Sequence, residues 1–172
     1  MFNKINTHND WDKLREIIVG TNVGSTPTIT WNRKEKIDQK NVDEALELLK
    51  KSSPQWLVDE VEEDLNELAI TLEKLGVKVH RPEVFDQSKI FSSPFWYSNS
   101  RNSYNVRDLH LVVGNSVIES PSHLADRYFE ATVLYNIFYQ YFKKGFKWVV
   151  APKPKLNYNS LVPYFDSDDN SE

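Results

Sequence analysis

The sequence predicts an α/β fold in which a unit of short strands and one long helix occurs twice. Two helical patterns carry this prediction, because apolar residues recur at steps of three and four after Pro54 and again after Leu124. Each pattern ends at a glycine and is followed by a short apolar run that stops at a proline, Pro82 or Pro152. The two halves therefore share one order of elements, which indicates an internal repeat.

The second half is predicted to contain a hairpin, a helix and a strand. Gly114-Asn115 is typical of a two-residue turn, and it separates two short β-branched runs at residues 109–113 and 117–119. Apolar residues then recur at helical spacing over residues 124–144, which predicts one continuous helix. A strand over residues 146–151 completes the order strand, strand, helix, strand.

Three polar side chains of the predicted hairpin are expected to gather on one face. With a two-residue turn, His110 lies opposite Glu119 and Asp108 lies opposite Pro121, and side chains two positions apart on a strand share a face. Asp108, His110 and Glu119 would then form a cluster whose carboxylates and imidazole could hold a metal ion. The alternative is a solvated hairpin face with no function.

The first half begins with a predicted strand over residues 14–19 that ends at Gly20, and a short helix is expected over residues 42–50. The longest helical pattern follows Pro54 and leads into a strand over residues 77–81. The apolar stripe of this helix is expected to pack in the core of its own domain. The stripe comprises Leu57, Val61, Leu65, Leu68, Leu72 and Leu75.

Three further stretches lack a helical pattern. An edge strand is expected around residues 28–31, and the charged run over residues 33–40 is expected to lie on the surface. Residues 83–103 form a long connection rich in aromatic residues. Two roles are possible for this connection: it forms a lid over a binding site, or it packs over the sheet.

Composition and charge exclude several classes of protein. A net charge of −4 gives no basic surface for nucleic acid. The 172 residues contain no cysteine, which excludes disulfides, thiolate metal sites and a cysteine nucleophile within them. No run approaches the roughly 20 apolar residues of a membrane span, and residues 1–11 lack the apolar core of a signal peptide. We therefore expect a cytoplasmic protein with no nucleic-acid or membrane partner.

Six short motifs in the second half occur in one order and at one spacing. They are Arg107-Asp108-Leu109, Val112-Val113-Gly114, Ile118-Glu119, Pro121, Arg127-Tyr128-Phe129-Glu130 and Ala151-Pro152-Lys153-Pro154. Together they resemble the amidinotransferase family, which includes glycine amidinotransferase and the inosamine-phosphate amidinotransferases. A string of matched positions is more specific than any one of them.

The resemblance implies a pentein-type α/β propeller, in which five strand-strand-helix-strand blades surround a central active site. The matched positions run over residues 10–156, so residues 1–172 would form a single partial propeller domain of about two blades. The first blade is expected at residues 10–82 and the second at residues 104–156. A polar acidic tail is expected over residues 157–172.

The resemblance also implies a chemistry. In that family a cysteine attacks the guanidine carbon of arginine, a histidine moves protons, and the amidino group passes to an amine such as glycine. Asp108 matches an aspartate that holds the substrate guanidinium, which a carboxylate suits because both groups are planar. Arg127 matches a motif arginine near the active site, with a helix-anchoring salt bridge as the alternative. Asp169 matches an aspartate that assists the histidine, with a disordered acidic tail as the alternative.

The sequence departs from the family pattern at important positions. Residues 122–127 read Ser-His-Leu-Ala-Asp-Arg, where the family has Met-Ala-Trp-Arg-Ser-Arg, and no cysteine is present. His80, His110 and His123 do not occupy the position of the family histidine. These departures place both the nucleophile and the choice of acceptor in question.

Three functions are therefore open. The first is the N-terminal portion of an amidinotransferase-like protein, which alone is inactive and uses no cofactor. The second is a non-catalytic module that binds arginine, another guanidino small molecule or a protein partner. The third is the metal-dependent site at Asp108, His110 and Glu119. A homo-oligomer is expected in each case, because an open fragment of two blades leaves apolar faces uncovered.

Overall fold

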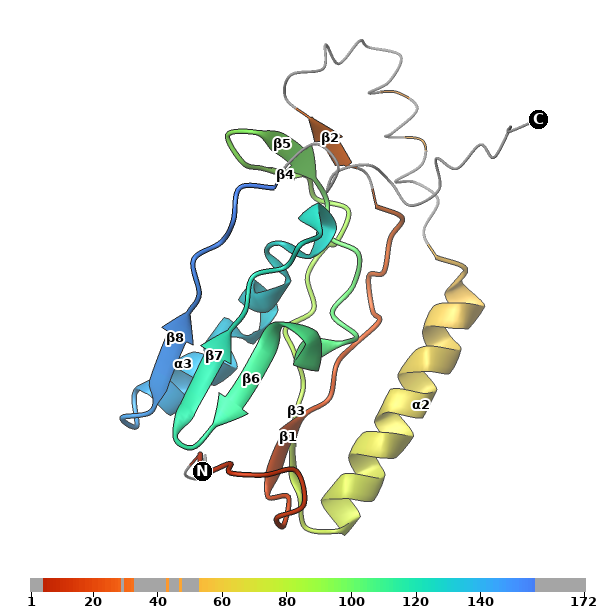
Figure 1. The fold of residues 1–172 in the computed structure, drawn as a ribbon. Coiled ribbons are helices and arrows are strands. Elements are labelled where there is room, and N and C mark those ends of the chain that lie inside the picture. The colour runs from red at the N-terminus through yellow and green to blue at the C-terminus, as the bar shows by residue number, and fades with distance from the viewer. Residues whose placement is uncertain (1–4, 29, 33–42, 44–46, 48–52, 157–172) are drawn as a thin grey trace, which may run out of the picture.

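The computed structural model describes most of the chain (Figure 1). The described residues are 5–28, 30–32, 43, 47 and 53–156. Most of the helix predicted over residues 42–50 falls outside the described residues. The charged run over residues 33–40 and the acidic tail over residues 157–172 also lie outside them.

The first unit consists of two parallel strands joined through a long helix. β1 (Glu16–Ile18) and β3 (Lys78–His80) are neighbours in a two-stranded sheet. The helix α2 (Gln55–Lys74) connects them and begins directly after Pro54. The predicted order of strand, helix and strand is therefore confirmed. A helical crossover of this kind is the usual connection between two parallel strands.

The α2 helix is less buried than its apolar pattern predicts. Among its residues, Val58 and Leu65 are fully buried. By contrast, Leu57, Leu68 and Leu75 are 39%, 47% and 70% exposed. The expectation that the whole stripe packs in the core is therefore wrong for these three leucines. The helix is rotated so that the line through Val58 and Leu65 faces the interior, and spacing alone does not fix that rotation.

The second unit has the predicted hairpin, register and closing strand. β6 (His110–Val113) and β7 (Ser116–Glu119) are antiparallel, and His110 lies opposite Glu119 as expected. β8 (Lys147–Val150) runs parallel to β7, which gives the strand order β6-β7-β8. The repeat of strand, helix and strand is therefore present in both units, and β6 adds a third strand to the second sheet.

The prediction of one continuous helix over residues 124–144 is wrong. The segment instead contains two 3₁₀ turns, η2 (Ala125–Arg127) and η3 (Glu130–Leu134), before the shorter helix α3 (Tyr135–Phe142). The backbone departs from helical geometry at Phe129, where φ is −110° and ψ is 8°. Two charged side chains of η2 bind partners elsewhere in the fold, Arg127 with Asp108 and Asp126 with Arg101. Such tertiary contacts outweigh helix propensity.

The α3 helix lies between the two sheets. On one side, Phe138 of α3 packs in a buried cluster with Val117 of β7. On the other side, Ile18 of β1 packs against the same cluster, and the Tyr141 hydroxyl donates to the Glu16 carboxylate. The layers therefore follow the order α2, β1–β3 sheet, α3, β6–β7–β8 sheet, and Figure 1 shows α3 behind the second sheet.

The aromatic connection over residues 83–103 holds part of a third sheet. β4 (Phe91–Ser92) and β5 (Trp96–Ser98) form a hairpin, and β2 (Thr30–Asn32) pairs with β5. Trp96 is 1% exposed and belongs to a second core cluster. The connection therefore packs into the fold, and the predicted edge strand before it is present as β2.

Candidate functional site

Asp108 lies in a turn that precedes the hairpin. Residues Val106–Leu109 form the 3₁₀ turn η1, and strand pairing begins only at His110. Within the turn, the Asp108 N–H donates to the Asn105 carbonyl at 3.2 Å. The expectation that Asp108 lies opposite Pro121 and shares a strand face with His110 is therefore wrong, because the turn removes Asp108 from the alternation of the strand.

Two of the residues that the sequence singled out are in direct contact. Arg127 Nη1 donates to Asp108 Oδ2 at 2.7 Å. The Asp108 side chain is 49% exposed, and its Oδ1 accepts no hydrogen bond from the described residues. The third candidate, Asp169, lies outside the described residues.

Glu130 holds the other edge of the Arg127 guanidinium. Arg127 Nε and Nη2 donate to the two carboxylate oxygens of Glu130, the second at 2.9 Å. The Glu130 side chain is 5% exposed. The hydrogen bonds to Glu130 raise the pKa of Arg127, and burial raises the pKa of the Glu130 carboxyl. Bidentate pairing fixes the plane of the guanidinium, which leaves Nη1 to reach Asp108.

The sequence did not single out Glu130 as a functional residue. A usable signal was present, because Arg127 and Glu130 are three positions apart and such residues meet on one side of a helical turn. The observed pair matches the alternative in which Arg127 anchors the helical segment. Its contact with Asp108 additionally links the turn η1 to the turn η2.

The backbone after β1 lies close to the chain just before the Asp108 turn. Gly20 follows β1, and a Cβ atom at this position would lie 2.0 Å from the Tyr104 carbonyl oxygen. Next to it, the Thr21 N–H donates to the Ser103 carbonyl at 3.1 Å. Only glycine leaves room for this contact, so Gly20 allows the first unit to hold the chain directly before η1.

Glu119 is a buried carboxylate on the α3 side of the second sheet. It is 1% exposed, and its Oε1 lies 3.3 Å from Lys153 Nζ and accepts from the Tyr135 hydroxyl at 3.5 Å. Its Oε2 has no hydrogen-bond partner among the described residues. Lys153 also donates to the Tyr128 carbonyl at 2.8 Å. The Lys153 ammonium therefore ties the end of the sheet to the residue that follows Arg127.

His110 packs between the hairpin and α3. Its Nδ1 donates to the Val106 carbonyl at 2.9 Å, and its ring lies against Phe138 with the centroids 4.8 Å apart. Its Nε2 is buried without a hydrogen-bond partner among the described residues. Burial lowers the pKa of His110 below its ordinary value of 6.5, which favours the neutral ring.

The hypothesis of a metal site at Asp108, His110 and Glu119 is wrong. Asp108 binds Arg127, whereas His110 packs on α3 and Glu119 binds Lys153. Within the described part of the chain, no group of three or more histidine, cysteine, aspartate or glutamate residues could hold a metal ion.

The burial of His110 predicts a pH dependence of stability. Because its pKa is lowered from 6.5 in the fold, the unfolded chain binds the proton more readily, and the free energy of unfolding should fall as the pH drops below about 6.5. His110→Asn removes the titrating ring and keeps a donor for Val106. Urea unfolding between about pH 5 and 7 should show a weaker pH dependence for this variant. His123→Asn, which removes an exposed histidine, should keep the wild-type profile, and parallel profiles for all three proteins would contradict the prediction.

No family model matches the chain. Inosamine-phosphate amidinotransferase 1 of Streptomyces griseus is 35% identical over 160 residues, which are 92% of this chain and 46% of that protein. The mitochondrial glycine amidinotransferase of Xenopus tropicalis is 33% identical over 151 residues, which are 87% of this chain and 36% of that protein. The solved structure of the Streptomyces griseus inosamine-phosphate amidinotransferase superposes with a TM-score of 0.75 and 33% identity, over 92% of this chain and 47% of that chain. Over about half of their length, amidinotransferases are therefore similar to this chain in both sequence and fold.

A second solved amidinotransferase leads to the same fold. It comes from the saxitoxin biosynthetic pathway of Microseira wollei and superposes with a TM-score of 0.73 and 34% identity, over 88% of this chain and 43% of that chain. The chain spans about half the length of the curated amidinotransferases that it matches. Its fold is a partial pentein-type α/β propeller. Among the described residues, no helix is long and apolar enough to cross a membrane.

Proposed function

We propose that this chain is a guanidino-binding portion of an amidinotransferase-type protein, with Asp108 as the carboxylate that binds arginine or another small guanidino compound. The contact between Asp108 and Arg127 carries the proposal. Asp108 already holds one guanidinium at 2.7 Å, and its other oxygen, on a half-exposed side chain, accepts no hydrogen bond from the described residues. A carboxylate in this state can accept a further charge-assisted hydrogen bond from a ligand.

In this proposal Arg127 acts as a positioning residue. Glu130 holds two of its nitrogens and Asp108 accepts from the third, so the guanidinium fixes the orientation of the Asp108 carboxylate. The charges of Asp108, Arg127 and Glu130 sum to one negative charge. The group therefore attracts a single cationic guanidinium even though it contains an arginine.

We further propose that the 172-residue chain does not transfer an amidino group by itself. Breaking the bond between the guanidine carbon and its nitrogen in this family needs a thiol nucleophile, and the chain has no cysteine. The acidic residue Asp169 therefore has no histidine-cysteine pair to assist within these residues. The activity of a longer protein would depend on groups that other residues supply.

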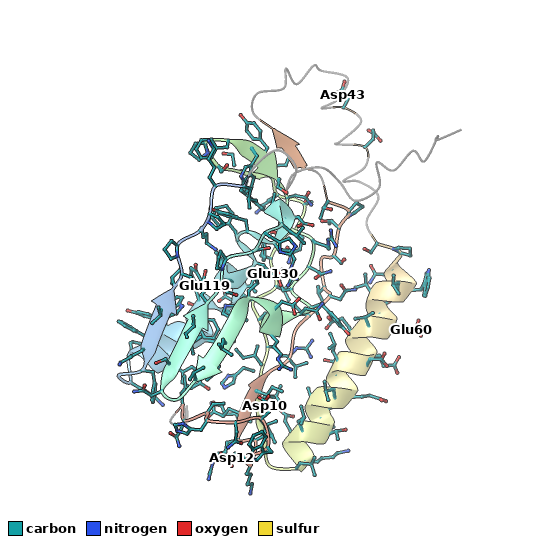
Figure 2. All side chains as sticks on the ribbon, in the orientation of Figure 1. Asp10, Asp12, Asp43, Glu60, Glu119 and Glu130 are labelled. Atoms are coloured by element: carbon teal, nitrogen blue, oxygen red, sulfur yellow. The ribbon has the colours of Figure 1, made fainter. Side chains whose placement is uncertain are left out.

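Calorimetry with arginine tests the binding proposal. We expect a dissociation constant on the order of 1 mM or lower for arginine, and no binding of citrulline, which has the same length but an uncharged ureido group. Asp108→Asn should abolish the arginine signal, because it removes the charge and keeps the shape. Asp10→Asn is the matched control, since Asp10 is exposed and lies away from the site in Figure 2.

The binding proposal and the inactivity proposal can be contradicted separately. Equal arginine binding by the wild type and Asp108→Asn, or no binding by either, would exclude Asp108 as the guanidinium ligand. Release of ornithine when the purified chain is incubated with arginine and glycine would exclude the proposed inactivity. The binding results concern the site alone, and ornithine release concerns the chemistry alone.

A further inference from the structure

One face of the β6–β7–β8 sheet carries an uncovered apolar row. Leu111, Ile118 and Val149 are cross-strand partners, so they form one row across the three strands. Leu111 and Val149 are 57% and 49% exposed. The alternate residue Val117 packs in the cluster around α3, so this row lies on the opposite face. In Figure 1, α3 lies behind the sheet and no helix of the described residues is drawn in front of it.

One flank of the α2 helix is uncovered in the same way. Leu57, Leu68 and Leu75 are separated by 11 and 7 residues, which places them on one line along the helix axis. This α2 flank lies beside the line through Val58 and Leu65 that faces the interior. All three leucines are more than a third exposed. Exposed leucines therefore lie at both ends of the flank and at Leu68 between them.

Within one molecule, the equivalent sheet face of the first unit is covered by a helix. The β1–β3 sheet is covered by α3, the helix of the following unit, through Ile18 and through the hydrogen bond from Tyr141 to Glu16. The β6–β7–β8 sheet occupies the equivalent position in the second unit, and no described helix follows it. Among the residues that the structure describes, the layered order thus leaves an uncovered helix flank at one end and an uncovered sheet face at the other.

We propose that the α2 flank of one copy of this chain docks on the outer face of the β6–β7–β8 sheet of a second copy. The contact repeats, between two molecules, the helix-on-sheet packing that joins the two units within one molecule. The two surfaces differ, so the contact is heterologous and head-to-tail. Further copies can add to the free surface at each end, and the assembly closes into a ring or grows as a chain.

The charges on the two surfaces are complementary. The α2 helix contains seven carboxylates and one lysine, and Asp64 lies within the flank, seven residues after Leu57 and four before Leu68. Figure 2 shows Glu60, one turn before Asp64, on the side of α2 turned away from the sheets. The sheet face presents Lys147, which is exposed and shares a row with Val113. Opposite charges next to an apolar contact select this orientation over others.

A charge-reversal experiment on the intact chain tests the contact. The wild type should self-associate in sedimentation equilibrium over a concentration series. Asp64→Lys and Lys147→Glu should each raise the dissociation constant at least about tenfold, because each brings like charges together. Both residues are exposed, so circular dichroism should show an unchanged fold. Glu63→Lys makes the same charge change on the other side of α2 and should leave association unaltered.

Mixing the two single variants provides the decisive measurement. In an equimolar mixture, the lysine introduced by Asp64→Lys in one variant meets the glutamate introduced by Lys147→Glu in the other. The second contact pairs the unchanged Asp64 with the unchanged Lys147. Association should therefore return to within a few-fold of the wild-type constant. A monomeric wild type, association that neither reversal weakens, or a mixture that stays as weak as its components would each overturn the proposal.

Discussion

Replacing Trp96 with alanine is expected to lower the free energy of unfolding by about 3–5 kcal/mol. Trp96 is 1% exposed, and its ring packs edge-on against Phe91 and Tyr128, with centroids 5.9 Å and 5.1 Å away. Removing the indole leaves a cavity that the surrounding side chains fill only in part, so both transfer energy and packing are lost. Urea unfolding followed by circular dichroism measures the difference.

Trp56→Ala is the matched control for this prediction. It removes the same side chain from a position on α2 that is 66% exposed. Surface substitutions of this kind change stability by about 0.5 kcal/mol or less. Equal losses in the two variants would contradict the assignment of Trp96 to a core that holds the third sheet against η2.

Replacing Arg127 with methionine is expected to cost about 3–5 kcal/mol of stability. The substitution leaves Glu130, which is 5% exposed, without the guanidinium that binds both of its oxygens. An unpaired carboxylate in such an environment is strongly destabilising, because water does not replace the lost partner. Asp108 also loses its partner but contributes little, since it is half exposed. Chemical denaturation at neutral pH measures the loss.

The pH dependence identifies Glu130 as the cause of that loss. Burial already raises the pKa of Glu130, and without Arg127 the pKa should rise further. A carboxyl whose pKa is higher in the folded than in the unfolded state gains stability at low pH and loses it as the pH rises through the folded value. The variant should therefore recover stability as the pH falls. Arg127→Met combined with Glu130→Leu should recover most of the loss at neutral pH, and a double variant as unstable as the single one would contradict the explanation.

Short-range signals in the sequence predicted much of the fold. The Gly114-Asn115 turn fixes the hairpin register, because a slip by one residue would move every side chain to the other face. The opposition of His110 and Glu119 is confirmed for this reason. The α2 helix was also predictable, since its pattern continues without a break for 20 residues after Pro54.

The orientation and the interruption of helices could not be predicted in this way. The apolar pattern of α2 is compatible with several rotations, and packing against the sheet selects one that leaves Leu57, Leu68 and Leu75 uncovered. The predicted second helix is interrupted at Phe129, where the pattern gives no sign of a break. Part of the cause is a contact over 19 residues between Arg127 and Asp108, which periodicity does not encode.

The candidate site was predicted in part. The resemblance to amidinotransferases named Asp108 and Arg127, and the structure brings them together at 2.7 Å. The placement of Asp108 on the strand was wrong, because the three-residue spacing of a 3₁₀ turn replaced the alternation of the strand at Val106–Leu109. Glu130 was missed because its partner is Arg127 rather than a residue of the hairpin.

The position of α3 between two sheets has a consequence for the way the chain folds. The hydrogen bond between Glu16 and Tyr141 joins residues 125 positions apart, and contacts of such long range slow folding. During synthesis, β1 leaves the ribosome long before the helix that covers it. The β6–β7 hairpin, with its two-residue turn, can form within microseconds of its appearance. β1, the first strand to be synthesised, is therefore among the last to be buried.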